Sequence, residues 1–299
     1  MLRESTLVLL VVSWIVGVAR AGQEVAAVVE DKQIRVTVAG KLFTCYKFDP
    51  VQKYPYFFPL NGPITDRSVT TETSQPYPHH HSLFFGCDRV SGGNYWQESN
   101  EHGQIVSAGP KIVEAKGERV VIEDRCRWTR PGAPDPFSEK RTIVITAPDA
   151  KRRLIDVTIT LTAESDVHIE KTNHALFAGR IAPHLCAEKG GRLVNAEGDV
   201  GEKATFGKKS AWCDYSGNNH GTVEGMAILD WPKNRWSPCP WFTRDYGFFS
   251  PTPMFWLGPE GVRFKKGESV TLKYRVVVHA GNEKDADVAG VFKRWIAEP

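Results

Sequence analysis

The feature that most constrains the fold is alternation of apolar and polar residues over several long stretches. In 154–163, apolar side chains at every second position alternate with an aspartate and three threonines. The stretch 270–278 has the same pattern, and 118–128 and 141–147 fit it as well, separated by a Pro/Gly loop at 131–136. Successive side chains of a strand point to opposite faces, so this pattern predicts half-buried strands. Short strands divided by turn residues predict an all-β fold, a large antiparallel β-sandwich.

One helix is expected, near the C-terminus. Residues 286–297 carry apolar side chains at i, i+3, i+4 and i+7, and Asn282 or Asp285 could cap the helix. We expect the helix to pack on the edge of the sandwich. No linker, low-complexity tract or repeat interrupts residues 22–299, which predicts a single β-sandwich domain. The expected apolar stripe consists of Val288, Val291, Phe292 and Trp295.

The N-terminal residues indicate export. Arg3 precedes an apolar run of 12 residues, Leu7–Val18, and Ala19-Arg20-Ala21 has the small-x-small form of a cleavage site. A spanning helix needs about 20 apolar residues, so we interpret 1–21 as a signal peptide. The prediction is a secreted or periplasmic protein with no membrane association after cleavage. The alternative is an uncleaved N-terminal anchor.

Charge and cysteine content exclude several classes of protein. The formal net charge is +3 over 299 residues and no block of Lys and Arg stands out, so nucleic acid is not an expected partner. Six cysteines in an exported chain allow disulfides, and we expect at most one. Because no two of them form a CxxC, a zinc ribbon and a thioredoxin-type motif are excluded. Oligomeric state cannot be predicted from these features.

The most informative stretch for function is VHIEKTNHALFAGRIAPHL, residues 167–185. If it is one strand, Glu170, His174 and Arg180 share a face, which is unusual for a buried core and suits a polar cleft. Glu170 and His174 would lie roughly 13 Å apart along a straight strand, far enough to flank a sugar-sized ligand. The alternative is that this face is simply exposed to solvent.

Three consecutive histidines form the second candidate, in PYPHHHSLFFGCD. In an extended chain His79 and His81 face one side and His80 the other, so only an HxH pair converges. Imidazoles bind zinc, copper, iron or nickel, which makes a divalent transition metal the low-ranked alternative to no cofactor. The preferred interpretation is a pocket of neutral imidazoles that act as acid, base or hydrogen-bond donors. The other histidines that could complete a metal site are His102, His174, His184 and His220.

Aromatic residues and prolines mark the third candidate, residues 230–256, which hold four Trp and five Pro. So many prolines cannot form a regular central strand throughout. A stiff loop that presents Trp241 beside Arg244, Asp245 and Tyr246 suits sugar recognition, because apolar C–H faces of sugars stack on aromatic rings. The alternative is that these Trp fill the core and that Arg244 and Asp245 form a local ion pair.

Four segments carry a resemblance to a known family: Pro78-His79-His80, Gly86–Trp96, Arg180 and Arg244–Gly247. With these segments in this order, the chain resembles an exported bacterial family labelled PmoA-like ("methane oxygenase PmoA"). The sequence departs from the family pattern at three places: His81 replaces Arg or Lys, Thr252-Pro253 replaces Asn-Pro, and Cys87 occupies a position that is often His. A methane monooxygenase subunit is an integral membrane protein, so we do not carry methane oxidation over to a chain without a spanning segment. The resemblance implies a β-sandwich similar to the galactose mutarotase supersandwich.

These observations predict an exported carbohydrate-active protein that performs acid–base chemistry on a sugar or glycoside, as an epimerase, lyase or hydrolase. A non-catalytic carbohydrate-binding protein and a metal-dependent oxidoreductase built on His79 and His81 are the alternatives. The expected partner is a carbohydrate or glycoside. The predicted catalytic residues are His79, His80, Glu170, His174 and Asp245, and the predicted substrate-binding residues are Arg180, Trp241, Arg244 and Tyr246.

Overall fold

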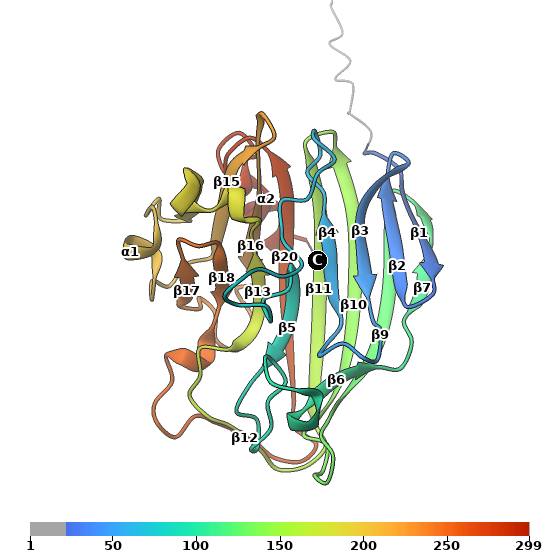
Figure 1. Cartoon of the computed structure of the whole chain (residues 1–299), viewed down its shortest axis with the longest axis vertical. Helices are drawn as coiled ribbons and strands as arrows, with labels where there is room; N and C mark the ends of the chain where they lie inside the picture. The colour runs from blue at the N-terminus through green and yellow to red at the C-terminus, as the bar shows by residue number, and fades with distance from the viewer. Residues whose placement is uncertain (1–21, 299) are drawn as a thin grey trace, which may run out of the picture.

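The structure, a computed structural model, describes residues 22–298. The predicted signal peptide, residues 1–21, lies outside the described residues. Two nine-stranded antiparallel sheets and a two-stranded ribbon make up the fold, and Figure 1 shows most strands running along the long axis of the molecule. The antiparallel β-sandwich predicted from the alternation is therefore confirmed.

The first sheet has, in order, β17 (Trp241–Arg244), β18 (Phe248–Pro251), β13 (Ala175–Arg180), β5 (Leu83–Cys87), β4 (Tyr56–Leu60), β3 (Lys41–Lys47), β2 (Gln33–Val38), β1 (Val25–Glu30) and β8 (Lys116–Gly117). The second has β14 (Arg192–Asn195), β15 (Trp212–Asn219), β16 (Thr222–Asp230), β20 (Ser269–Ala280), β11 (Arg152–Ala163), β10 (Phe137–Asp149), β9 (Arg119–Thr129) and β6 (Gln104–Ser107), with β7 (Lys111–Glu114) also paired to β9. The ribbon pairs β12 (Val167–Ile169) with β19 (Val262–Phe264). The helices are α1 (Glu202–Thr205), α2 (Val288–Ile296) and the 3-10 turns Asn100–His102, Pro183–Leu185, Ala187–Lys189 and Pro253–Phe255.

The core lies between the two large sheets. Phe177 on β13 stacks on Tyr274 of β20 with ring centroids 4.5 Å apart, and Tyr46 on β3 donates its hydroxyl to Asp124 of β9 at 2.8 Å. On β11 the apolar positions of the predicted alternation are buried and the threonines between them are not. Burial of one face at a spacing of two residues fixes the register, because a slip by one residue would expose the whole apolar set.

Helix α2 covers the outer face of the second sheet, not its edge as predicted. Val288, Val291 and Trp295 of the predicted stripe are buried in a second apolar cluster with residues of β11, β15, β16 and β20. The predicted cap is also wrong, because Asp287 caps the helix and its carboxylate accepts the backbone N–H of Gly290. The part of the second sheet that α2 covers is therefore buried on both faces.

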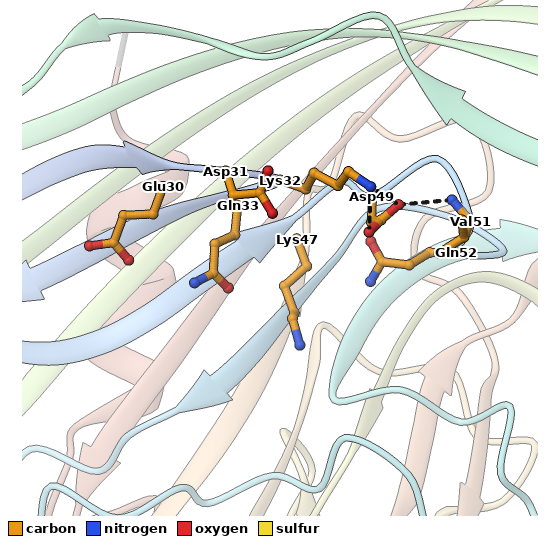
Figure 2. A pocket seen from close by; sticks show the side chains of 8 residues that line it. All are labelled: Glu30, Asp31, Lys32, Gln33, Lys47, Asp49, Val51 and Gln52. Carbon is orange, nitrogen blue, oxygen red and sulfur yellow. Dashed lines mark hydrogen bonds and ion pairs between the residues drawn. The ribbon is translucent and has the colours of Figure 1, made fainter.

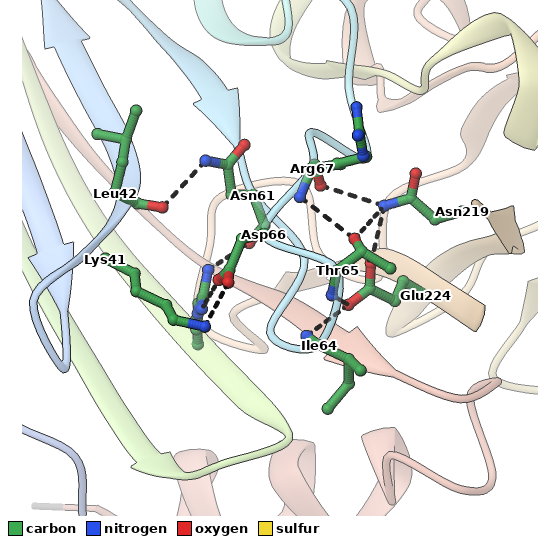
Figure 3. Close-up of polar contacts among 10 residues, drawn as sticks. Lys41, Leu42, Asn61, Ile64, Thr65, Asp66, Arg67, Asn219 and Glu224 are labelled. Atoms are coloured by element: carbon green, nitrogen blue, oxygen red, sulfur yellow. Dashed lines mark hydrogen bonds and ion pairs between the residues drawn. The ribbon is translucent and has the colours of Figure 1, made fainter. Parts of the chain in front are cut away.

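The long connection from β4 to β5 carries the histidine triplet, and its first part is fixed to the second sheet. Figure 3 shows the carboxylate of Glu224, on β16, accepting hydrogen bonds from the backbone N–H of Ile64 at 2.7 Å and from Asn219 Nδ2 at 2.7 Å. Glu224 also accepts the hydroxyl and the backbone N–H of Thr65. This buried anchor ties the start of the connection to the opposite sheet.

The sequence also led to expectations about the cysteines and about membrane association. All six cysteines are buried and free. Within residues 22–298, no helix is both long enough and apolar enough to span a bilayer.

Candidate functional site

A pocket of about 310 Å³ collects most of the polar side chains that the sequence singled out. It is built from segments far apart in the chain: the turn before β5, the residues just before β13, and the hairpin of β17 and β18. Its lining consists of Tyr77, His79, His80, Gln97, Asn173, His174, Phe242, Arg244, Tyr246 and Phe248.

His174 and Asp88 meet because of the register between β5 and β13. These strands are antiparallel with Ala175 opposite Cys87, so the next residues outward, His174 and Asp88, also face each other. The backbone N–H of Asp88 donates to the carbonyl of His174 at 3.0 Å, and Nδ1 of the imidazole lies 2.8 Å from Oδ2 of the carboxylate. Asp88 is 6% exposed and His174 is 24% exposed, so the carboxylate is covered while the ring reaches the pocket.

The carboxylate sets the tautomer of this imidazole. An ionised carboxylate can only accept, so Nδ1 of His174 carries the proton and donates it to Asp88. The lone pair is therefore on Nε2, which makes no hydrogen bond within residues 22–298. A histidine oriented in this way by a buried aspartate can take a proton at Nε2, and the aspartate stabilises the imidazolium that forms.

His79 and His80 line the same pocket as neutral groups. Burial, with a further contribution from His174, lowers the pKa of His79 to about 4. Burial, with a further contribution from His79, lowers the pKa of His80 to about 2. The ring of His80 stacks on Phe248 with centroids 4.4 Å apart. Both rings are uncharged at neutral pH, so they can form hydrogen bonds with a ligand, and their catalytic roles stay predictions.

His81 does not line the pocket that His79 and His80 line. The first two histidines of the triplet lie within a turn in which the N–H of His80 donates to the carbonyl of Tyr77 at 3.1 Å, so the alternation of an extended chain does not apply. The ring of His81 stacks on Tyr56 with centroids 4.5 Å apart. Among residues 22–298, no group of three or more His, Cys, Asp or Glu side chains is arranged to hold a metal ion.

An arginine and two tyrosines form another part of the wall. Burial, together with Tyr77, raises the pKa of Tyr246 to about 12, so its phenol is a neutral hydrogen-bond donor. The rings of Tyr77 and Tyr246 stack with centroids 5.0 Å apart. Arg244 pairs with Glu202 through Nη1 at 2.9 Å, and its Nε and Nη2 have no partner in the part of the chain that the structure describes. Two donors of this guanidinium are thus available to a ligand.

Arg180 lies behind this wall and does not line the pocket. Its Nε and Nη2 donate to the hydroxyl of Ser74 at 3.2 and 2.9 Å. The guanidinium carbon lies 4.5 Å from the centre of the Tyr246 ring, within the range of a cation–π contact. Arg180 therefore supports Tyr246. The sequence predicts that Arg180 binds substrate, but its side chain does not line this pocket.

The stretch 167–185 is not one strand, and this separates Glu170 from His174. It breaks into β12 and β13 because residues 170–174 form a polar connection, in which the N–H of His174 donates to the hydroxyl of Thr172 at 3.0 Å. Glu170 is exposed and lines a neighbouring hollow instead. The predicted pairing of Glu170 with His174 across one ligand is therefore not formed in this pocket.

Asp245 and Trp241 also lie outside the pocket. Oδ1 of Asp245 accepts the backbone N–H of Glu202 at 2.9 Å, so this carboxylate supports the first turn of α1. Trp241 is fully buried, and its Nε1 donates to the carbonyl of Ser210 at 2.9 Å. Trp241 fills the core because its segment pairs as β17 with β18 and is not a free loop.

Sequence reasoning missed the residue that completes the site, Asp88. It stands in the segment that carries the histidine triplet and follows a buried apolar run, as His174 precedes one. Polar residues at the ends of two buried strands are the available signal, but only the pairing of β5 with β13 shows that they meet. Tyr77, Gln97 and Asn173 had no comparable signal.

Other hollows show why chemistry, and not size, selects the site. Figure 2 shows one of about 280 Å³ between the turn of β1 and β2 and the residues after β3, with an exposed ion pair of Lys32 and Asp49 at 3.1 Å. Most of its side chains are charged, and none is an imidazole or an aromatic ring. The pocket with His174 combines an imidazole oriented by a buried carboxylate with aromatic walls.

Comparison with known proteins gives a family and distant structural likenesses. No curated protein matches the chain. Among solved structures, it is similar to galactose 1-epimerase from Lactobacillus acidophilus, with 10% identity, a TM-score of 0.41, and coverage of 88% of this chain and 100% of that one. It is also similar to a candidate aldose 1-epimerase from Klebsiella pneumoniae, with 8% identity, a TM-score of 0.45, and coverage of 93% and 88%. Scores this low carry no argument about function.

The match to a protein family covers most of the chain. The model of a family of unknown function, DUF6807, matches residues 33–293 and so includes every residue of the pocket. This match does not show the PmoA-like assignment, which stays a prediction from sequence motifs. The chain belongs to the DUF6807 family.

Proposed function

We propose that this protein is an exported enzyme that moves a proton on a carbohydrate, with His174 as the base. The observation that carries the proposal is the 2.8 Å contact between His174 Nδ1 and buried Asp88 at the wall of a polar pocket. Export rests on the N-terminal sequence. The reaction class is isomerisation or elimination at a sugar carbon or at the anomeric hydroxyl.

The shape and lining of the pocket favour a sugar unit. Its volume of about 310 Å³ is at the small end for ligand sites, which suits a single ring. Tyr77, Tyr246 and Phe242 offer aromatic surface for the C–H groups of a sugar, while His79 and His80 offer neutral hydrogen-bonding groups for its hydroxyls. A small pocket with both kinds of surface suits a compact polyhydroxylated ligand better than it suits a purely apolar ligand or a purely ionic ligand.

The proposed chemistry assigns one step to each group. Nε2 of His174 takes a proton from the sugar, and Asp88 stabilises the resulting imidazolium through Nδ1–H. Nε and Nη2 of Arg244 hold the oxygen on which negative charge develops. The imidazolium then returns the proton to a carbon or oxygen of the isomerised sugar or, in elimination, to the departing oxygen, so the histidine ends the cycle in its starting state.

The lining also argues against glycoside hydrolysis by paired carboxylates. That mechanism needs two Asp or Glu side chains that flank the scissile bond. Among the described residues that line the pocket none is Asp or Glu, because Glu170 and Asp245 lie elsewhere and Asp88 is covered by His174. This lining favours proton transfer by one histidine over hydrolysis by two carboxylates.

The test is proton NMR of a panel of aldoses, uronic acids and disaccharides incubated with the purified protein in D₂O. Epimerisation, anomer exchange and elimination all appear in such spectra as new signals or as deuterium at carbon. Asp88→Asn should lower the rate on any converted sugar by about 10²–10⁴-fold, since the amide no longer imposes the reactive tautomer.

Asp245→Asn is the matched control, because it changes the same group outside the pocket. It should retain nearly the full rate. Conversion of no sugar by the wild type would refute the enzymatic proposal, and binding without conversion would favour a carbohydrate-binding protein. An equal loss in the two variants would refute the role of Asp88.

A further inference from the structure

A second, larger hollow adjoins the pocket. Its volume is about 550 Å³, and Asn173 lines both cavities. The connection 170–174 carries Glu170 and Lys171 in the second hollow and His174 in the first. The two cavities are therefore neighbours along one short segment, and a ligand seated beside His174 can extend past Asn173 into the second hollow.

The far wall of this hollow is fixed by the ribbon of β12 and β19. His168 Nε2 lies 2.8 Å from the carbonyl oxygen of Glu260, which ties the ribbon to the loop before β19. Gly261 has φ +63°, and a Cβ at this position would lie 2.2 Å from the carbonyl oxygen of Ile169. The two segments thus approach more closely than any side chain at Gly261 would permit.

The side chains of the hollow match a hydroxyl-rich ring. Phe255 gives an aromatic surface, with Lys171 Nζ 5.9 Å from its centre. Arg89 uses Nη1 to donate to the carbonyl of Lys171 at 3.0 Å and has no carboxylate partner within residues 22–298. Lys171 and Glu170 likewise have no ion-pair partner in the described part of the chain. Unpaired charged donors and an acceptor beside an aromatic ring can bind sugar hydroxyls on one face and C–H groups on the other.

We propose that this hollow is a second sugar subsite and that the substrate has at least two linked units. The inner unit lies against His174, and the outer unit lies over Phe255 between Arg89, Glu170 and Lys171. This inference rests on the proposed function, because it takes the inner pocket to be the sugar site. It assigns to Glu170 a binding role in place of the predicted catalytic one.

The experiment compares single sugars with their dimers by isothermal titration calorimetry. The probes are glucose with cellobiose, galactose with β-1,4-galactobiose, and galacturonate with digalacturonate. We expect at least one dimer to bind about tenfold or more tightly than its monomer. The double variant Glu170→Ala/Lys171→Ala should bring this preference down about tenfold. Glu24→Ala/Lys116→Ala removes an exposed ion pair of the same types on the first sheet and should keep the preference.

The outcomes separate the two proposals. Equal binding of every monomer and dimer, or a dimer preference that the Glu170/Lys171 variant leaves intact, overturns the second subsite while the inner site stands. Binding of none of the six probes overturns the carbohydrate function and the subsite together. Loss of preference in the control variant as well would show that the effect is not local, and this also overturns the subsite.

Discussion

Two histidine–aspartate pairs in this molecule have the same chemistry and opposite surroundings. His174 and Asp88 lie 2.8 Å apart at the wall of the pocket, and His279 on β20 and Asp214 on β15 lie 2.6 Å apart in the second sheet. The second pair is fully buried, with both side chains 0% exposed, whereas His174 is 24% exposed. The pairs differ in whether the second ring nitrogen of the histidine has a hydrogen-bond partner.

In the buried pair both ring nitrogens of His279 are occupied. Nε2 faces Asp214, and Nδ1 lies 3.2 Å from the carbonyl oxygen of Gly281. The pair spans β16 at Gly225, where a Cβ would lie 2.9 Å from Cε1 of His279. His174 uses one nitrogen for Asp88 and turns the other to a cavity. A histidine–aspartate pair can therefore do chemistry only where it leaves a nitrogen free and accessible, and otherwise it serves stability.

The largest expected effect is on turnover at the open pair. His174→Ala should lower the rate of sugar conversion by about 10²–10⁴-fold, because the proton acceptor is lost. The unfolding free energy should fall by about 1–3 kcal/mol, less than at the fully buried pair, because water in the pocket can reach the carboxylate of Asp88 once the ring is gone. Rates by NMR and urea unfolding check both numbers, and a variant that keeps its rate would remove His174 from the mechanism.

The buried pair should show the reverse. His279→Ala should lower the unfolding free energy by about 3–5 kcal/mol, because it leaves the carboxylate of Asp214 buried and unpaired. The double variant His279→Ala/Asp214→Ala should recover part of this loss, since the unpaired carboxylate is gone as well. Urea unfolding followed by tryptophan fluorescence measures the change. A single variant as stable as the wild type would contradict the structural role.

The contributions of the buried pair and of the pocket histidines His79 and His80 to stability should change with pH in opposite directions. Burial opposes the charged form of His279, but the charge and hydrogen bond of Asp214 outweigh it and raise its pKa. Its contribution to stability is therefore complete below about pH 6.5, the ordinary histidine pKa, and is lost as pH rises through the raised value. Burial lowers the pKa of His79 to about 4 and the pKa of His80 to about 2. The contribution of these two histidines to stability is therefore present above about pH 6.5 and is lost as pH falls toward the lowered pKa values.

Unfolding free energies from about pH 5 to about pH 9 test these signs. His279→Gln should flatten the alkaline side of the curve, and His80→Phe should flatten the acid side. Identical curves for the wild type and His279→Gln would show that the buried pair does not titrate as argued.

The smallest effect is expected at His81, the member of the histidine triplet that lies outside the pocket. His81→Gln should change the rate by less than about threefold, since the change in transition-state energy should stay near 0.5 kcal/mol. His79→Gln is the matched comparison and should cost more, because His79 lines the pocket. Equal losses would return the triplet to consideration as one functional unit.

Local patterns predicted the scaffold well. The alternation in β11 and β20 reflects one buried face each, and the stripe of α2 reflects contact with one sheet face. These signals are properties of neighbouring residues. The same reasoning failed for 167–185, where polar residues form an irregular connection between two short strands, and for the histidine triplet, which begins within a turn and is not extended.

The site itself depends on contacts that no local pattern contains. Asp88 and His174 are 86 residues apart and meet only through the register of β5 with β13. Trp241 was a reasonable sugar-stacking residue in a proline-rich segment, but pairing of β17 with β18 places it in the core. Prediction of such a site needs the strand order, which composition and periodicity leave open.

The measurement that tests the central claim most directly is chemical rescue of His174→Ala by imidazole. The structure places a cavity where the ring was, next to Asp88, so free imidazole should restore at least about a tenth of the lost rate on the sugar that the wild type converts. The double variant Asp88→Asn/His174→Ala should respond much less. A His174→Ala protein that still binds the sugar and gains no rate from imidazole would contradict the claim that this histidine moves the proton.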